Sequence, residues 1–325
     1  MMLYRITLTA KTAFATGFKG DTLFGQCCWA IRNLHGGVRL VDLLGGYTDQ
    51  RPFLVLSDPL PAGYFQRPNL PLDLLGLNLA DSKQRKLHKA KRWVPESSLV
   101  VPLSQWVEEL INDKELGARA GLGDAGLLQS QTRQHNSLNR LTGTTGAGEA
   151  GFAPFDRDLL WYHPNLKLAI FAVLDEGRFS AQELQDVLQA VGQQGYGKEA
   201  SSGCGKFEIW SIEPYSPPVP PAPDAWLTLA PCLPQGLAWQ AEQCYYEVFT
   251  RFGRHGDRAV HTGKPFKNPV LMAQSFAVLT PAKFNASRLF TGRGVDGLSK
   301  APGFEATVQQ GYSPVIPVQL KEARP

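Results

Sequence analysis

The chain has 325 residues, of which 43% are hydrophobic and 19% are charged, and its formal net charge is +4. These values are typical of an ordinary soluble globular protein long enough for two domains, and the mild charge identifies no partner by itself. No apolar run approaches the roughly 20 residues of a membrane span. Five cysteines without a C-x-x-C pair argue against disulfides and a zinc site. We therefore expect no membrane contact, no metal and a cytoplasmic location.

The first predicted elements are a strand and a helix. Polar and apolar residues alternate over residues 4–9, which indicates a strand. After a loop that contains Lys19, Asp21 or Thr22 is expected to cap a helix. The glycine pair at 36–37 should end it. Its apolar stripe comprises Leu23, Phe24, Cys27, Cys28, Ile31 and Leu34.

Short strands are expected at residues 53–57 and 63–65, and an insertion follows from about residue 66 to about residue 128. The basic residues that this insertion holds within ten positions are Lys83, Arg85, Lys86, His88, Lys89, Lys91 and Arg92. Such a run fits a solvated, charged face and a contact with nucleic acid equally well.

A long β-hairpin is expected beyond the insertion. A polar, strand-like segment covers residues 129–143, a glycine-rich tip covers 144–151, and a second strand covers 155–162. The residues spaced to line the base of this ribbon are Arg133, His135, Asn136 and Arg140. Arginine bridges phosphates and asparagine can read a base edge, so we expect these four to contact RNA. Alternatively, these side chains stabilise the hairpin itself. For His135, RNA contact and support of the hairpin are equally consistent with the sequence.

A second strand–helix–strand unit follows the hairpin. The nearly continuous apolar run at 166–174 predicts a central strand. Ser180 and Glu183 form a capping box for a helix. The stripe of that helix comprises Leu184, Val187, Leu188 and Val191, and another strand is expected at 207–212. The order β-α-β, insertion, hairpin, β-α-β predicts an α+β fold of the ferredoxin-like or RRM-like kind.

A glycine-rich loop covers residues 195–207, between this helix and the last strand. Glycine allows positive φ and close backbone approach, so such a loop can present N–H groups to an anion, and lysines suit phosphate. The residues expected to contact RNA here are Gly195, Gly197, Lys198, Ser201, Ser202, Gly203, Gly205 and Lys206. A dinucleotide-binding loop would need the strand before the glycines, and P-loop spacing fails at Ala200 and Phe207. A turn without a ligand is the alternative.

The Pro-rich segment at 216–225 is the clearest domain boundary. We assign residues 1–215 to the ferredoxin-like domain, with its insertions, and residues 226–325 to a β-rich domain that could be a degenerate copy of the first. Strand candidates in the second half are residues 226–230, 244–251, 273–279 and 315–320, and helix signals there are weak.

Four stretches resemble the RAMP proteins, the RRM-like RNA-binding subunits of CRISPR systems. The glycine-rich loop is similar to their G-rich loop. Residues 19–31 (KGDTLFGQCCWAI), 135–143 (HNSLNRLTG) and 310–317 (QGYSPVIP) are similar to one RAMP family, the fourth subunit of the type III-A CRISPR (Csm) effector complex. Lys19 stands where relatives often have a histidine, and a lysine suits phosphate at a helix N-terminus as well or better.

This resemblance implies a non-catalytic RNA-binding subunit without a cofactor. It would hold the 5′ repeat-derived tag of the guide RNA (crRNA) and take part in antiviral defence. Its protein partners would be the large polymerase-domain subunit and the first copy of the backbone RAMP subunit, which it would bridge. Backbone amides and lysines would bind phosphates, while aromatic or amide side chains would take splayed bases.

Two other functions are open. RAMP-fold endoribonucleases that process precursor guide RNA cut without metal and use a histidine near the first helix, and His35 lies just past that helix. A solvated residue at the end of a helix is the simpler interpretation of His35. The second alternative is a protein scaffold that touches no RNA. Asp156 and Asp158, which flank Arg157, are more typical of a salt-bridged surface than of a metal site.

Overall fold

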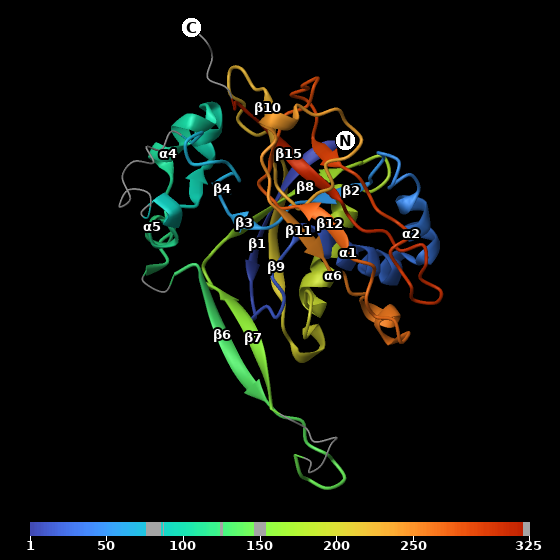
Figure 1. Cartoon of the computed structure of the whole chain (residues 1–325). Helices are drawn as coiled ribbons and strands as arrows, with labels where there is room; N and C mark the ends of the chain where they lie inside the picture. The colour runs from blue at the N-terminus through green and yellow to red at the C-terminus, as the bar shows by residue number, and fades with distance from the viewer. Residues whose placement is uncertain (76–85, 87, 124–125, 146–153, 321–325) are drawn as a thin grey trace.

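The computed structural model describes the chain except for residues 76–85, 87, 124–125, 146–153 and 321–325 (Figure 1). The fold is a mixed α+β arrangement of several antiparallel sheets. Among the described residues, no helix has the length and apolarity needed to cross a membrane.

An antiparallel sheet with strand order β2-β8-β1-β9 forms the centre of the first half. Its strands are β1 (Met2–Ala10), β2 (Leu54–Leu56), β8 (Leu168–Leu174) and β9 (Phe207–Pro214), and β3 (Leu60–Pro61) also pairs with β8. Helices α1 (Gly20–His35) and α6 (Ala181–Gln194) complete the order β1-α1-β2-β8-α6-β9. The strands and helices of both strand–helix–strand units therefore form where the sequence predicts them.

Strand β8 and helix α6 form for the local reasons that the sequence indicates. Every residue of β8 is buried, as expected for an apolar run between two neighbouring strands. The Ser180 side chain accepts from the Glu183 N–H, and the Glu183 carboxylate accepts from the Ser180 N–H, so the predicted capping box is confirmed. The predicted stripe of α6 is buried in the core.

Helix α1 begins differently from the prediction. Its N-cap residue is Lys19, which makes no side-chain cap, and Asp21 lies inside the first turn. The N–H of Gly20 instead donates to Oδ1 of Asp58 at 2.8 Å. The capping acceptor therefore comes from the segment between β2 and β3, so the predicted caps Asp21 and Thr22 are wrong.

Gly36 ends α1 with a φ of 88°, and a second helix, α2 (Gly37–Leu44), starts immediately after it. No sequence pattern predicted this helix. Leu34, assigned to the buried stripe of α1, is exposed. It lies in the last turn of α1, beyond the part of the helix that packs on the sheet.

The insertion packs its own small core against the sheet. Strand β4 (Tyr64–Gln66) leads into the insertion and pairs with its first strand, β5 (Trp93–Pro95). Its other elements are η1 (Glu96–Val100), η2 (Leu103–Gln105), α4 (Trp106–Glu109) and α5 (Asp113–Arg119). Phe65 stacks on Phe171 of β8, with ring centroids 5.4 Å apart, and Trp106 is fully buried. The insertion therefore covers part of the sheet rather than standing apart from it.

The predicted hairpin is present as β6 (Leu128–His135) and β7 (Phe155–Tyr162). Figure 1 shows it extending away from the rest of the molecule. Its register runs from Leu128 opposite Tyr162 to His135 opposite Phe155. Of the predicted tip, residues 146–151 lie outside the described residues.

The second half is β-rich. One sheet has the order β13-β10-β15-β14, and β11 and β12 form a separate ribbon. The strands are β10 (Ala225–Thr228), β11 (Val248–Arg251), β12 (Val270–Ala273), β13 (Val278–Leu279), β14 (Phe290–Gly292) and β15 (Tyr312–Val318), with short helices η5 (Ala241–Gln243) and η6 (Asp257–His261). The strand expected at 273–279 is interrupted, because Phe276 has a φ of 65°.

The two halves share one buried core. Leu227 of β10 and Ile316 of β15 belong to the same apolar cluster as Ile6 of β1. The Gln310 side chain accepts from the N–H of Leu56 at 2.9 Å and donates to its carbonyl at 2.7 Å. The division into two domains at the Pro-rich segment stays a prediction.

Candidate nucleic-acid interface

The glycine-rich loop is tightly folded. Gly195, Gly197, Gly203 and Gly205 all have positive φ, between 76° and 106°. A Cβ on Gly205 would lie 2.1 Å from the Tyr196 carbonyl oxygen, and one on Gly195 would lie 2.3 Å from that of Cys204. These two glycines are required by close backbone packing, whereas Gly203 faces open space.

Many of the loop's backbone amides already have partners within the protein. The N–H groups of Lys198 and Lys206 donate to the hydroxyls of Thr16 and Thr12, both at 2.9 Å. The N–H groups of Ser202, Gly203 and Cys204 donate to carbonyls of the loop itself, where η4 (Ala200–Ser202) forms. The loop therefore offers an anion mainly its exposed side chains, which are those of Lys198, Ser201, Ser202 and Lys206.

The buried side chain of Tyr196 joins the loop to the start of α1. Its hydroxyl accepts from the Lys19 N–H at 3.0 Å and donates to the Gly17 carbonyl at 3.0 Å. Its ring packs on Phe18, with centroids 4.6 Å apart. Burial raises the pKa of this phenol, so it stays protonated. No sequence pattern indicated this role for Tyr196.

Lys19 lies at the N-terminus of α1, as predicted, but its charge is paired. Its Nζ lies 2.6 Å from Oδ2 of Asp58, which is 4% exposed. The same carboxylate accepts from Gly20 and from the hydroxyl of Ser275 in the second half. A phosphate at this helix end would therefore meet a lysine that is already neutralised.

The hairpin stands next to the glycine-rich loop. Phe14, in the segment after β1, pairs with Leu160 of β7 as an isolated bridge. Nη1 of Arg157 lies 3.0 Å from the carboxylate of Glu199, inside the loop. Arg157, which the sequence analysis treated only as the residue between two aspartates, therefore links the two predicted RNA-contacting segments.

The register gives the hairpin two different faces, because directly opposed residues share a face. On one face, Arg133 lies opposite Arg157 and His135 opposite Phe155. Trp161 adds an exposed indole to this face, with the Arg133 guanidinium 5.8 Å from its ring. We call this set the basic–aromatic face; its members are Arg133, His135, Phe155, Arg157 and Trp161.

The opposite face is polar and acidic. Thr132 donates to Oδ1 of Asp158 at 2.7 Å, and Gln134 lies opposite Asp156. The two aspartates thus share a face of the ribbon, as predicted. Among the described residues, no group of three or more His, Cys, Asp or Glu side chains is placed to hold a metal.

The four hairpin residues predicted to contact RNA lie toward the far end of the ribbon, not at its base. Arg133 and His135 are in the last three residues of β6, while Asn136 and Arg140 follow the strand. The base is formed instead by Leu128 and Tyr162. The two-residue period of a strand places Phe155 and Trp161 on one face of β7. Only the register of β6 against β7 shows that Arg133 lies on the same face.

The basic run of the insertion is partly committed to the protein. The Arg92 guanidinium donates twice to Asp113, at 2.8 Å each, and the Trp93 indole donates to the same carboxylate. Lys83 and Arg85 lie outside the described residues. This pairing gives Arg92 a structural role, and both interpretations of the rest of the basic run stay predictions.

His35 is exposed in the last turn of α1, beside Gly36. The helix has 16 residues, which places His35 about 24 Å along its axis from the loop-facing N-terminus. Among the described residues, His35 has no hydrogen-bonding or ion-pair partner that would orient its imidazole. The geometry therefore separates it from the predicted RNA-contacting segments.

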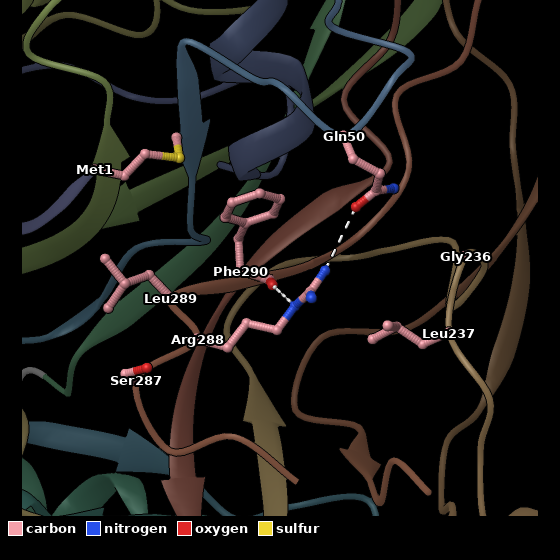
Figure 2. Close-up of a pocket in the computed structure, with 8 residues that line it drawn as sticks. All are labelled: Met1, Gln50, Gly236, Leu237, Ser287, Arg288, Leu289 and Phe290. Atoms are coloured by element: carbon pink, nitrogen blue, oxygen red, sulfur yellow. Dashed lines mark hydrogen bonds between the residues drawn. The ribbon is translucent and has the colours of Figure 1, made fainter. Parts of the chain in front are cut away.

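A pocket of about 460 Å³ opens elsewhere, between the two halves, and Figure 2 shows the residues around it. Nε of Arg288 donates to the Phe290 carbonyl at 2.8 Å, and Nη2 donates to the Gln50 side chain at 3.4 Å. The Gln50 amide in turn donates to Gly292. These polar groups are bonded to one another and to backbone carbonyls, and they connect the two halves. We assign the pocket no ligand.

No protein-family model matches the sequence, and no curated protein matches it. Solved structures do match its fold. A chain of the crystal structure of a Csm3–Csm4 subcomplex in the type III-A CRISPR-Cas interference complex aligns with a TM-score of 0.58 and 12% identity, covering 98% of this chain and 100% of that chain.

Two crystal structures of a Csm1–Csm4 cassette match as well. The one in complex with AMPPNP has a TM-score of 0.57 and 12% identity, and the one in complex with pppApA has 0.56 and 13%. Both alignments cover 99% of this chain and 100% of the other. At such identities the likeness establishes the fold, and it extends over the whole length. The chain therefore has the fold of the Csm4 subunits of type III-A CRISPR complexes, as the resemblance of its sequence motifs predicted.

Proposed function

We propose that this chain is a non-catalytic, RNA-binding subunit of a type III-A CRISPR effector complex. It holds the 5′ repeat-derived tag of the crRNA and bridges the large polymerase-domain subunit and the backbone subunit. The observation that carries this proposal is the full-length fold match to chains from both Csm1–Csm4 and Csm3–Csm4 assemblies. Csm1 is the large subunit and Csm3 the backbone subunit in those assemblies, which supports one partner of each kind.

The described surface supports the RNA part of the proposal. The basic–aromatic face of the hairpin combines the Arg133 guanidinium, which can pair with phosphates, with aromatic rings, on which splayed bases stack. The exposed Lys198, Ser201, Ser202 and Lys206 of the glycine-rich loop lie next to it, joined through the Arg157–Glu199 ion pair. A strand of RNA that follows the hairpin toward the body would meet both.

The fold part of the proposal is a ferredoxin-like first half with a degenerate counterpart in the second. The strand order β2-β8-β1-β9, with α1 and α6 as crossovers, supports the first assignment. The second half keeps a four-stranded antiparallel sheet, and the described residues beyond Gln194 contain only short 3₁₀ helices.

The endoribonuclease alternative is less well supported. General acid–base catalysis needs a histidine within reach of the scissile phosphate and a partner that sets its orientation. His35 is about 24 Å along α1 from the end of the helix that meets the glycine-rich loop, given its 16 residues. A protein scaffold that touches no RNA is the remaining alternative, and the basic–aromatic face argues against it.

Co-expression of this chain with a large subunit and a backbone subunit encoded beside it tests the proposal. We expect the three proteins to copurify with RNA whose molecules share one constant 5′ end. Preparations that lack this chain should lose the large subunit from the backbone. RNA cleavage that disappears in His35→Ala would identify a processing enzyme instead. Assembly without any bound RNA would identify a scaffold.

A further inference from the structure

An exposed tryptophan stands on the first sheet, outside the hairpin and the glycine-rich loop. Trp210 of β9 is 60% exposed. The pairing of β1 with β9 shifts register there, because Ser211 lies opposite Thr7 while Ile209 lies opposite Leu8. Trp210 is therefore the extra residue of a β-bulge, a device that re-aims a side chain.

The bulge turns Trp210 away from the face of β9 that packs on the helices. Ile209 and Ile212 lie opposite the fully buried Leu8 and Ile6, so both isoleucines point to the core. In a regular strand, two residues three apart would lie on opposite faces. The extra residue keeps the core contacts of both isoleucines and leaves the indole in solvent.

Two lysine cations and one hydroxyl lie close to this indole. Nζ of Lys11 and Nζ of Lys167 each lie 6.0 Å from the ring centroid. The indole N–H donates to the hydroxyl of Thr9 at 3.0 Å, which fixes the ring orientation. Lys11 also pairs with Glu208, whereas Lys167 forms no ion pair in the described part of the chain.

The insertion leaves this end of the sheet open. It covers the other end, where Phe65 stacks on Phe171 and the Arg5 guanidinium lies over the Tyr215 ring. Arg5 and Tyr215 both contact Glu96 of the insertion. Trp210 is thus the exposed aromatic residue on a face whose remaining aromatic side chains are packed against protein.

We propose that Trp210 is a stacking platform for one base of a single-stranded RNA, with Lys11 and Lys167 contacting the phosphates on either side of that base. Aromatic residues on a four-stranded sheet are used in this way by RNA-binding domains, and stacking accepts any base. The proposal rests on the RNA-binding function proposed above and adds a subsite on the sheet.

The surroundings of Trp210 favour RNA over a protein partner. The centre of a protein–protein interface is depleted of charged residues, particularly lysine and glutamate. Here the indole has two lysines as neighbours, and its N–H donates to the Thr9 hydroxyl at the ring edge. A lysine–aromatic set of this kind matches the alternating phosphates and bases of a single strand.

The location connects the subsite to the segments already described. The Lys11 N–H donates to the carbonyl of Lys206, at the end of the glycine-rich loop, at 2.8 Å. Three residues beyond Lys11, Phe14 pairs with Leu160 of the hairpin. One short segment after β1 thus joins Trp210, the loop and the hairpin, so a single RNA strand can contact all three.

The test measures the affinity of the full chain for a uridine 12-mer by fluorescence anisotropy over a salt series. We expect Trp210→Ala to weaken binding about tenfold, and Trp210→Tyr to retain most of it. Lys167→Ala should lower the slope of log affinity against log salt by about 0.7. Phe252→Ala, which removes another exposed aromatic ring from the second half of the chain, should change neither the affinity nor the salt slope.

A second measurement does not depend on how the variants fold. A 12-mer that carries 4-thiouridine should crosslink to the peptide containing Trp210 in the unaltered chain. Unchanged affinity in Trp210→Ala, or crosslinks confined to other peptides, would overturn the stacking platform. Loss of a protein partner from Trp210→Ala with unchanged RNA affinity would identify a protein contact instead.

The hairpin variant Arg133→Ala separates this inference from the proposed function. If Arg133→Ala weakens RNA binding and Trp210→Ala does not, only the stacking platform falls. If neither variant changes RNA binding and no RNA copurifies with the complex, both the stacking platform and the proposed function are wrong.

Discussion

At the scale of single residues, the four glycines of the loop differ in what a side chain would meet. Gly205 and Gly195 lie against carbonyl oxygens, at 2.1 and 2.3 Å from an added Cβ, whereas Gly203 faces open space. The sequence pattern alone does not distinguish between these glycines. Gly197 lies against the Thr16 side chain, whose Cβ would be 2.8 Å from an added Cβ, so Gly203 is the glycine of the four that needs only its left-handed backbone conformation.

We predict that Gly205→Ala destabilises the fold far more than Gly203→Ala. The first substitution forces the Tyr196 backbone to move, while the second costs only the left-handed conformation of a residue with a Cβ, about 1 kcal/mol. Urea unfolding of the two variants and the unaltered chain measures the difference. Equal free energies of unfolding for the two variants would contradict the packing described for Gly205.

At the scale of elements, the register of the hairpin decides which of its side chains share a face. A shift of one residue between β6 and β7 would exchange the faces of one strand and mix arginines with aspartates. The observed register instead collects Arg133 and Arg157 on one side and Asp156 and Asp158 on the other. Under the proposed function, the side that carries Arg133 and Arg157 would face the RNA.

We predict that Arg133→Ala weakens binding of crRNA and lowers its salt dependence by about one phosphate contact. Gln134→Ala, on the neighbouring but opposite-facing position, is the matched control and should change neither the affinity nor the salt dependence.

Arg140→Ala should act like Arg133→Ala, while Asn136→Ala should alter the path of the tag without changing the salt slope, because it removes no charge. Binding over a salt series and thermal melts of each variant check this. Unchanged binding in all three site variants would exclude the hairpin as an RNA contact.

The capping box of α6 gives a prediction about pH. Burial alone would raise the pKa of Glu183, but hydrogen bonds from Ser180 and Arg39 outweigh it and lower the pKa overall. A carboxylate with a lowered folded-state pKa stabilises the protein above its unfolded value of about 4.3. This contribution is lost as the pH falls through the folded pKa.

Ser180→Ala should therefore cost about 1 kcal/mol at pH 7, and the difference from the unaltered chain should shrink in strongly acidic solution. Thermal melts from pH 7 to pH 3 measure it. Gln182→Ala, on the same turn but outside the box, serves as the control. A pH-independent cost of Ser180→Ala would mean that Glu183 takes no part in the cap.

At the scale of the whole molecule, the two halves are joined through buried polar groups as well as through the apolar core. Asp21 of α1 accepts a hydrogen bond from Nη2 of Arg251 at 2.9 Å, and Nε of Arg251 lies 2.7 Å from its other oxygen. Burial raises the pKa of Asp21, while the Arg251 charge opposes the rise. The carboxylate is 2% exposed, so its charge depends on Arg251.

We predict that Arg251→Ala destabilises the protein by about 3–5 kcal/mol at pH 7, because it leaves a buried carboxylate without its partner. Loss of Arg251 raises the folded-state pKa of Asp21 further. An acid with a raised folded pKa loses stability as the pH rises from its unfolded value, about 4, so the cost should be small near pH 4 and largest at neutral pH. Urea unfolding at both pH values measures it. Asp21→Asn combined with Arg251→Met should recover part of the loss; no recovery would argue against an uncompensated charge as the cause.

The sequence alone determined the elements whose cause is local. The apolar run of β8, the alternation of β1 and the Ser180–Glu183 cap each depend on residues close together in the chain. The motif resemblance likewise predicted the fold that solved structures match. The expected strand at 273–279 failed at Phe276, whose positive φ no local pattern indicates.

The tertiary structure decided which predicted site residues are available. It paired Lys19 with Asp58, 39 residues away, and gave Lys198 and Lys206 the hydroxyls of Thr16 and Thr12 as amide acceptors. It also placed Arg157 and Trp161 beside Arg133 and turned Trp210 outward through a bulge. These outcomes depend on strand register and on contacts between distant segments. A local sequence pattern predicts neither the register nor the distant contacts, because the pattern of one strand is the same whichever residues of its partner lie opposite.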